Sequence, residues 1–140
     1  MLLDFVAAYD EADMVTGHFI RGHDLPIINS ALIEQGLGRL SSKLTSDTKL
    51  DLVKHGQLSV SQKNLTELLG VPKPKIDMPQ ASWREANRLT PAGIELTKGR
   101  VVGDIIQHKA LRTELLELGL LSAPRMWHPD ASNGSTNYVP

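Results

Sequence analysis

Asp24 has the residue type and the position that a metal-assisted reaction requires. It follows the apolar, partly β-branched run of residues 14–20 and precedes a stretch with helical spacing of its apolar residues. A carboxylate between a buried strand and a helix lies at the edge where open α/β sheets bind their ligands. Asp24 is therefore a candidate ligand of a divalent cation. The alternative is that Asp24 only caps the helix, by accepting hydrogen bonds from its first turn.

Asp104 and His108 form the second group of candidates. Asp104 lies in an apolar part of a long predicted helix, between the valines at 101–102 and the isoleucines at 105–106. A carboxylate on an apolar stretch needs a partner, and a bound cation is one such partner. His108 lies one helical turn later, where it could meet Asp104 and act as a general base. The alternatives are an Asp104 on the solvent side of the helix and a His108 on the helix surface.

Other polar residues have simpler interpretations. His18 and His23 flank the predicted strand end, and each is interpreted as a packing or surface residue rather than as a ligand. Asp47 and Thr48 follow a second predicted strand, where they are interpreted as the cap of the next helix. Trp83 is interpreted as the anchor of a short helix, and stacking on a nucleic-acid base is the alternative.

The composition is that of an ordinary globular domain, and it excludes several classes of protein. The 140 residues suffice for one domain with one core. The absence of cysteine excludes disulfides and cysteine-based zinc sites. No apolar run has membrane-spanning length and no signal-peptide pattern occurs, which predicts a cytoplasmic protein without a membrane partner. The formal net charge is −1, so binding to nucleic acid would need a local groove or a divalent cation.

The apolar periodicity predicts alternating helices and strands, which is typical of an α/β fold rather than of a helical bundle. The expected elements are a helix at 1–12, a strand at 14–20, a helix from 24 to a stop at 36–38, a strand at 43–47 and helices at 48–54, 59–70, 80–89 and 91–118. The last helix is predicted to bury Val101, Ile105, Leu111, Leu115 and Leu118. One domain is expected over residues 1–122, followed by an unstructured C-terminal tail over residues 123–140.

Four stretches in this order resemble the DEDD superfamily of 3′–5′ exonucleases, which have a ribonuclease-H-like (DnaQ-like) fold. Residues 13–24 resemble the second exonuclease motif, in which a strand with Gly-His-Asn leads to an aromatic-Asp pair. Residues 46–48 resemble the Asp-Thr that begins the next helix, and residues 61–71 resemble a leucine-rich helix that ends in Leu-Gly. Residues 100–105 resemble the third motif, a Tyr-x-x-x-Asp on a helix. The resemblance extends over about residues 1–121.

The resemblance implies a metal-dependent hydrolase that acts on single-stranded nucleic acid, with DNA favoured over RNA. Asp24 and Asp104 would be two of the four carboxylates that hold Mg²⁺ or Mn²⁺ in such a site. With His108 they make up the catalytic residues that the resemblance implies. The setting that it implies is the cytoplasm of a bacterial or phage-infected cell.

The sequence departs from the family's pattern at several positions. Phe19 stands in place of the usual Asn, and His23 stands in place of the aromatic residue before the Asp. Gly99 and Arg100 occupy the positions of the usual general bases, a histidine or a tyrosine. His108 is therefore the nearest substitute for that base.

The largest departure concerns the first motif, since no Asp-x-Glu on a strand precedes Asp24. The carboxylates that usually bridge both metals would be missing, so efficient hydrolysis is not expected from this chain alone. The chain would then be a fragment, a late-start product, or one half of a site that a second chain completes. The strand at 14–20 would also have an open edge, which favours pairing with a second chain or an oligomer.

These features together predict an α/β protein: a partial ribonuclease-H-like domain, helix-rich and with a reduced sheet. The predicted function is that of a 3′–5′ exonuclease domain that is weak or inactive as this chain alone. The alternative function is that of a catalytically inactive exonuclease-like module for binding or regulation. A third interpretation is a small, all-helical interaction protein in which residues 14–20 form no strand.

Overall fold

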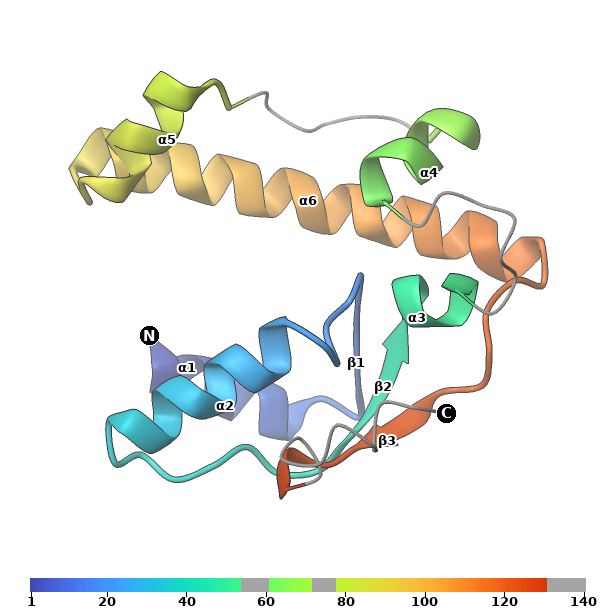
Figure 1. The fold of residues 1–140 in the computed structure, drawn as a ribbon, viewed down its shortest axis with the longest axis horizontal. Coiled ribbons are helices and arrows are strands. Elements are labelled where there is room, and N and C mark those ends of the chain that lie inside the picture. Colours follow the sequence, from blue (N-terminus) through green and yellow to red (C-terminus); the bar gives the residue numbers. More distant parts are fainter. Residues whose placement is uncertain (54–60, 72–77, 131–140) are drawn as a thin grey trace. The chain divides into compact units, whose positions relative to one another are not determined.

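The computed structural model describes residues 1–53, 61–71 and 78–130, and Figure 1 shows their helices and strands. The chain divides into two compact units, one of residues 1–56 with 121–140 and one of residues 57–120. The position of one unit relative to the other is not determined. The predicted α/β class is confirmed as a helix-rich fold with one small mixed sheet.

The sheet belongs to the first unit and has three strands in the order β1-β2-β3. β1 (Met14–Gly17) runs parallel to β2 (Lys43–Asp47), and Gly17 is in register with Asp47. β3 (Arg125–Trp127) runs antiparallel to β2. The strand predicted at 43–47 is therefore confirmed, and the all-helical interpretation is wrong.

β3 corrects the expectation of an unstructured tail from residue 123 onward. Residues 123–130 are described and contain this strand, whereas residues 131–140 lie outside the described residues. A strand of three residues carries almost no periodic pattern of its own. It forms because its backbone pairs with that of β2. The Thr45 hydroxyl strengthens this pairing by donating a hydrogen bond to the Arg125 carbonyl oxygen at 2.8 Å.

The strand predicted at 14–20 is shorter in the structure and ends at Gly17. Residues 18–23 form bends and turns before the next helix begins. Ile20 is nevertheless buried in the core, with 8% of its surface exposed. The apolar run therefore continues past the strand because the turn that follows is itself packed inward.

Three helices belong to the first unit: α1 (Leu2–Glu11), α2 (Asp24–Glu34) and α3 (Thr48–Val53). All three lie where the sequence predicts helices. α2 ends before Gly36, whose φ of 68° lies in the left-handed region that glycine adopts readily. The buried core of this unit contains Tyr9, Ile20, Leu25, Leu32, Leu40 and Trp127.

The second unit is helical and contains α4 (Gln62–Leu68), α5 (Gln80–Asn87) and α6 (Pro91–Glu117). The helices predicted in this region are confirmed, except that residues 59–60 lie outside the described residues. The side chain of Ser61 caps α4 by accepting from the Asn64 N–H, and Thr90 caps α6 by accepting from the Gly93 N–H. No helix among the described residues is long and apolar enough to cross a membrane.

The buried face of α6 differs from the predicted one. Three side chains that the periodicity predicts to be buried are instead 49–56% exposed: Val101, Ile105 and Leu118. The burial of Leu111 and Leu115 is confirmed. Gln107 is buried as well, and its side-chain oxygen accepts a hydrogen bond from Gln62 Nε2 of α4 at 3.2 Å. A polar residue can share the buried face here because another helix of the unit supplies its hydrogen-bond partner.

Tyr9 of α1 makes the stability of the first unit depend on pH. Its hydroxyl donates to the Ser41 carbonyl oxygen at 2.7 Å. Burial, and then the nearby Asp10 carboxylate, raise the pKa of Tyr9 from 10.0 to about 12. Because the folded state disfavours the phenolate, this contribution to stability is complete below pH 10.0 and is lost as the pH rises to about 12.

We expect Tyr9→Phe to lose about 1 kcal/mol of unfolding free energy at neutral pH, through the lost hydrogen bond. The variant should also lose less additional stability than the wild type between pH 10.0 and about 12. Urea unfolding at several pH values measures both effects, and Tyr138→Phe, at the sequence's other tyrosine, is the control. Equal pH dependence in Tyr9→Phe and the wild type would contradict this role of Tyr9.

Candidate functional site

The carboxyl ends of β1 and β2 meet at one edge of the sheet, because the two strands are parallel and Gly17 is in register with Asp47. Open α/β sheets place their ligands outside this edge. The turn at residues 18–23 follows β1 there, and α3 begins directly after β2. Both segments carry polar side chains, and their hydrogen bonds decide which of these side chains can meet a ligand.

Asp47 is fully buried at this edge, and backbone groups occupy its carboxylate. Oδ1 accepts hydrogen bonds from the N–H groups of Phe19 at 2.9 Å and of Lys49 and Leu50 at 3.2 Å each. Oδ2 accepts a hydrogen bond from the Arg21 N–H at 3.0 Å. The predicted capping role of Asp47 is therefore confirmed. Asp47 also binds the turn after β1, which the sequence pattern did not predict.

The turn after β1 is held in a strained form. Phe19 has a φ of 69°, in the left-handed region that asparagine tolerates and bulky residues rarely adopt. Its ring lies so close to Gly22 that a Cβ on that glycine would be 2.4 Å from the ring, and Lys49 Nζ lies 4.0 Å from the ring centroid. The hydrogen bonds to Asp47 and these contacts of Phe19 hold one conformation of the turn.

His18 directly follows β1, and its imidazole contacts the hydroxyl of Thr48 at the start of α3. Its Nδ1 is 2.8 Å from the Thr48 hydroxyl oxygen, and that hydroxyl donates to the Gly17 carbonyl oxygen at 3.3 Å. A hydroxyl has a single hydrogen to donate, so this arrangement places the proton of the His18–Thr48 hydrogen bond on Nδ1. These contacts support the interpretation of His18 as a packing residue.

Arg21 and Asp51 form a buried ion pair that the sequence pattern did not reveal. Nη2 of Arg21 is 3.9 Å from Oδ1 of Asp51, and the two side chains are 10% and 3% exposed. Oδ2 of Asp51 accepts a hydrogen bond from the Ser122 N–H at 3.1 Å, which connects α3 to the segment that leads into β3. The one sign in the sequence that Asp51 is buried and needs a partner was its position between two leucines of a predicted helix.

Asp24 follows the turn of residues 18–23 that continues from β1 at this edge, and it is exposed. Asp24 is the first residue of α2. The alternative that it is the N-cap of this helix is therefore wrong by one residue. The cap is His23, and no side-chain hydrogen bond caps the helix. Asp24 also lies beyond the turn of residues 18–23 rather than directly at the end of the strand. Its carboxylate is therefore not used by the first turn of its own helix, which the capping alternative required.

Asp104 and His108 lie on α6, in the second unit, whereas Asp24 lies in the first. Asp104 is partly buried, and its Oδ2 is 3.6 Å from Arg100 Nε, one turn earlier on the helix. His108 is buried, with 8% of its surface exposed, so the helix-surface alternative for this residue is wrong. Arg100 is thus a partner for the Asp104 carboxylate. The presence of a carboxylate on this apolar stretch of α6 can be explained by this ion pair, without a bond to His108.

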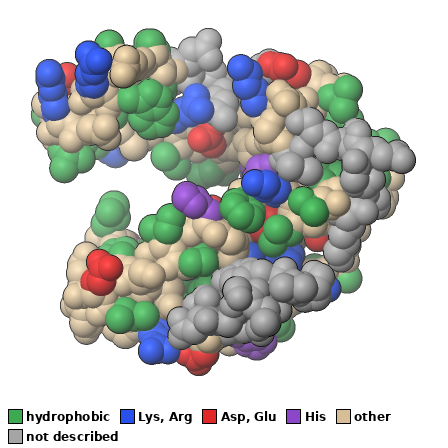
Figure 2. Space-filling view, viewed as in Figure 1, with side chains coloured by type: hydrophobic (Ala, Val, Ile, Leu, Met, Phe, Trp, Pro, Cys, Tyr) green, Lys and Arg blue, Asp and Glu red, His purple; other side chains and the backbone are tan. Residues whose placement is uncertain are grey.

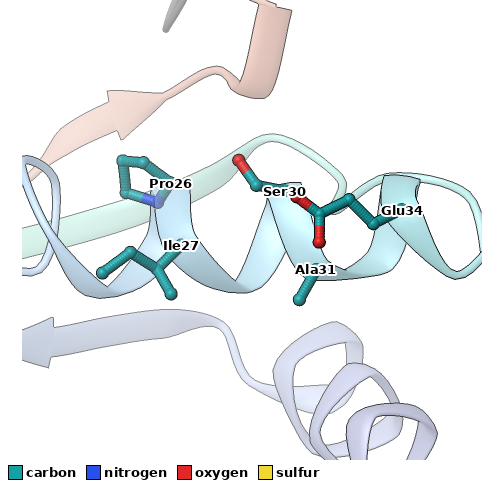
Figure 3. A pocket seen from close by; sticks show the side chains of 5 residues that line it. All are labelled: Pro26, Ile27, Ser30, Ala31 and Glu34. Carbon is teal, nitrogen blue, oxygen red and sulfur yellow. The ribbon is translucent and has the colours of Figure 1, made fainter.

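Over residues 1–53, 61–71 and 78–130, no three histidine or carboxylate side chains come together as a group that could hold a metal ion. A shallow hollow of about 330 Å³ lies along α2. Figure 3 shows the side chains that line it, all from this one helix: Pro26, Ile27, Ser30, Ala31 and Glu34. It has one charged group and a single wall, whereas small-molecule sites usually bring polar groups together from several elements.

Basic side chains do not form a continuous surface on the face of each unit seen in Figure 2, where acidic and apolar side chains lie between them. This agrees with 15 basic and 16 acidic residues in the sequence. No protein-family model, curated protein or solved structure matches this chain.

Proposed function

We propose that the chain is a ribonuclease-H-like, 3′–5′ exonuclease-type module that binds Mg²⁺ or Mn²⁺ through Asp24 and acts on single-stranded nucleic acid, preferably DNA. One observation carries the proposal. Asp24 is an exposed carboxylate that follows the turn at the carboxyl edge of a parallel strand pair, and its own helix does not use it as a cap. Hard divalent cations prefer such oxygen ligands.

The surroundings of Asp24 support a functional role because hydrogen bonds hold the turn that leads into Asp24 and α2 in one conformation. The N–H groups of Phe19 and Arg21 are bound by the buried Asp47, and the Leu25 N–H donates to the Ile20 carbonyl oxygen at 3.0 Å. A ligand held by a rigid turn loses little conformational entropy when it binds a cation. Phe19 is kept in a strained conformation, and such strain is concentrated at functional sites.

The same geometry limits the chemistry that this unit can perform. The carboxylates of Asp47 and Asp51 are buried and engaged in internal hydrogen bonds and an ion pair, which leaves Asp24, after the turn at this edge, as the exposed candidate ligand. A single carboxylate holds Mg²⁺ weakly, with water completing its coordination shell. Hydrolysis by two metals needs further carboxylates. Asp104 and His108 belong to the second unit, and the proposal for Asp24 assigns them no role.

A second candidate function is a binding or regulatory module of the same fold without catalysis. It is favoured by the lack of any group of three possible metal ligands over the described residues. In this case Asp24 would be a surface residue, and contacts with nucleic acid would not depend on a divalent cation.

We expect the wild-type chain to bind Mn²⁺ with a dissociation constant of about 10⁻⁴–10⁻³ M in calorimetry near neutral pH. Asp24→Asn should weaken this binding at least about tenfold, because it removes the charge of the ligand and keeps its shape. Glu34→Gln, at the other end of α2, makes the same change of charge and should leave the affinity unchanged. Release of nucleotides from a single-stranded oligonucleotide, with and without Mn²⁺, tests catalysis in the same proteins.

Two outcomes separate the candidates. Mn²⁺-dependent nucleotide release that persists in Asp24→Asn would overturn the assignment of Asp24. Absence of saturable heat with Mn²⁺, together with binding of the oligonucleotide in a chelator, would instead establish the non-catalytic module.

A further inference from the structure

The exposed face of α5 is aromatic, basic and polar, and it carries no carboxylate. Helical spacing brings five exposed side chains to one side of this helix and its C-cap: Gln80, Trp83, Arg84, Asn87 and Arg88. On the other side, Ala86 is buried and lies close to Gly93 of α6. The whole chain has 15 basic and 16 acidic residues, so a face with two arginines and no acidic residue is a local excess of positive charge.

Trp83 has the geometry of a platform on which a flat ring can stack. It is 44% exposed, so the packing of α5 on α6 does not enclose its indole ring. The guanidinium carbon of Arg100, on α6, lies over the ring at 5.9 Å from its centroid, within the range of a cation–π contact. Arg100 is held in turn by Asp104, whose Oδ2 is 3.6 Å from its Nε. One side of the indole is thus supported by a cation, and the exposed part of the ring can accept a second flat group.

The arginines beside Trp83 can bind anionic groups. The guanidinium of Arg84 is exposed and makes no ion pair with any residue that the structure describes. The side chain of Arg88, one turn later, is 70% exposed and reaches Glu85 only at 3.5 Å. Guanidinium groups bind phosphate oxygens well, and an exposed aromatic ring stacks on unpaired bases. An acidic peptide would use the arginines and leave the indole without a partner.

We propose that this face of α5 is a binding site for single-stranded nucleic acid, with a base stacked on Trp83 and neighbouring phosphates on Arg84 and Arg88. The inference rests on the proposed function for the class of its ligand, but it uses neither Asp24 nor a divalent cation. One stacked base and two phosphate contacts give weak binding that falls steeply as the salt concentration rises.

Fluorescence anisotropy of a labelled oligothymidine, in a chelator and at low salt, tests the proposal, with circular dichroism to check folding. Trp83→Leu removes the stacking ring and should weaken binding at least about fivefold. Trp83→Phe should recover most of this loss, since it restores an aromatic ring. A purely structural role of Trp83 would not produce this difference, because leucine and phenylalanine are both large apolar side chains.

The phosphate contacts are tested by the salt dependence of the same binding. Arg84→Gln should reduce the slope of the logarithm of the binding constant against the logarithm of the salt concentration by about 0.7, because one phosphate contact is lost. Lys109→Gln makes the same change of charge at an exposed position of α6, and it should leave the affinity and the slope unchanged.

A second measurement uses the wild type alone and stays decisive if Trp83→Leu does not fold. An abasic strand of the same length has the phosphates without the bases, so it should bind at least about fivefold more weakly than oligothymidine. Absence of oligothymidine binding, equal binding of the two strands, a folded Trp83→Leu variant that binds like the wild type, or polyglutamate that competes as well as unlabelled oligothymidine would each refute the site on α5.

The two proposals can fail separately. Asp24→Asn should bind oligothymidine in the chelator like the wild type, and Trp83→Leu should keep the wild-type affinity for Mn²⁺ in calorimetry. Loss of Mn²⁺ binding in Trp83→Leu, or loss of oligothymidine binding in Asp24→Asn, would contradict the independence of the α5 site from the cation site.

Discussion

Asp47→Ala is expected to lose about 3–5 kcal/mol of the unfolding free energy of the first unit. The substitution removes the acceptor of four backbone N–H groups, two of them from the turn after β1 and two from the first turn of α3. Asp47 is fully buried, so water cannot replace the carboxylate without opening the structure. Leaving buried donors unsatisfied costs more than the bonds contribute when they are formed.

Asp47→Asn is expected to lose less, about 1–3 kcal/mol. The amide oxygen can replace Oδ1, which accepts three of the four hydrogen bonds. The amide nitrogen then replaces Oδ2 and faces the Arg21 N–H, so two donors oppose each other. The order wild type, Asn and Ala in decreasing stability is therefore specific to this hydrogen-bond arrangement.

The measurement can be confined to the first unit. Trp127 is buried in its core, whereas Trp83 belongs to the second unit. In a Trp83→Phe background, the fluorescence of Trp127 during urea unfolding reports the first unit alone. Asp24→Asn is the matched control, because it removes an exposed carboxylate near the same turn and should change stability by less than about 1 kcal/mol. An Asp47→Ala variant as stable as this control would show that the buried hydrogen bonds contribute little.

Gly93→Ala is expected to destabilise the second unit by about 2–3 kcal/mol. Within a helix, alanine is normally more favourable than glycine by about 1 kcal/mol. At Gly93 the sign is reversed, since a Cβ would lie 2.2 Å from the Glu85 carbonyl oxygen and 3.0 Å from the Ala86 Cα. Both atoms belong to the backbone of α5, so relief requires that α5 move away from α6.

Hydrogen exchange and the fluorescence of Trp83, in a Trp127→Phe background, should both report the loosening of α5. Exchange should rise in the amides of α5 and in the first turns of α6. Ala92→Leu adds more volume at the neighbouring exposed position and should change stability by less than about 0.5 kcal/mol. A Gly93→Ala variant more stable than the wild type would mean that helix propensity outweighs the packing of α5 on α6.

The local signals in the sequence determined most of the secondary structure. The helices at 59–70 and 91–118 were readable because the helical spacing of apolar residues is a local pattern, but their caps, Ser61 and Thr90, were not predicted. The helix stop near Gly36 was readable for the same reason, since the left-handed conformation is a property of one residue. The strand at 43–47 and the capping role of Asp47 also follow from neighbouring residues.

Contacts between distant segments decided the rest. β1 ends early because Asp47 binds the N–H groups of residues 19 and 21. β3 exists because β2 pairs with it, although Thr45 and Arg125 are 80 positions apart in the sequence. The ion pair of Arg21 with Asp51 likewise joins two elements, so neither residue signals it alone. Such pairings depend on which elements pack together, and the periodicity of one segment does not encode this.

The sequence by itself determined that Asp24 stands at a helix start after an apolar run, but a cap and a metal ligand both require that position. The tertiary structure removes the cap interpretation, because it assigns the cap position to His23 and leaves Asp24 exposed, and the metal-ligand role stays a proposal. The physical reason is that capping depends on backbone angles at a single residue. The turn held by Asp47, 23 residues farther along the chain, sets those angles.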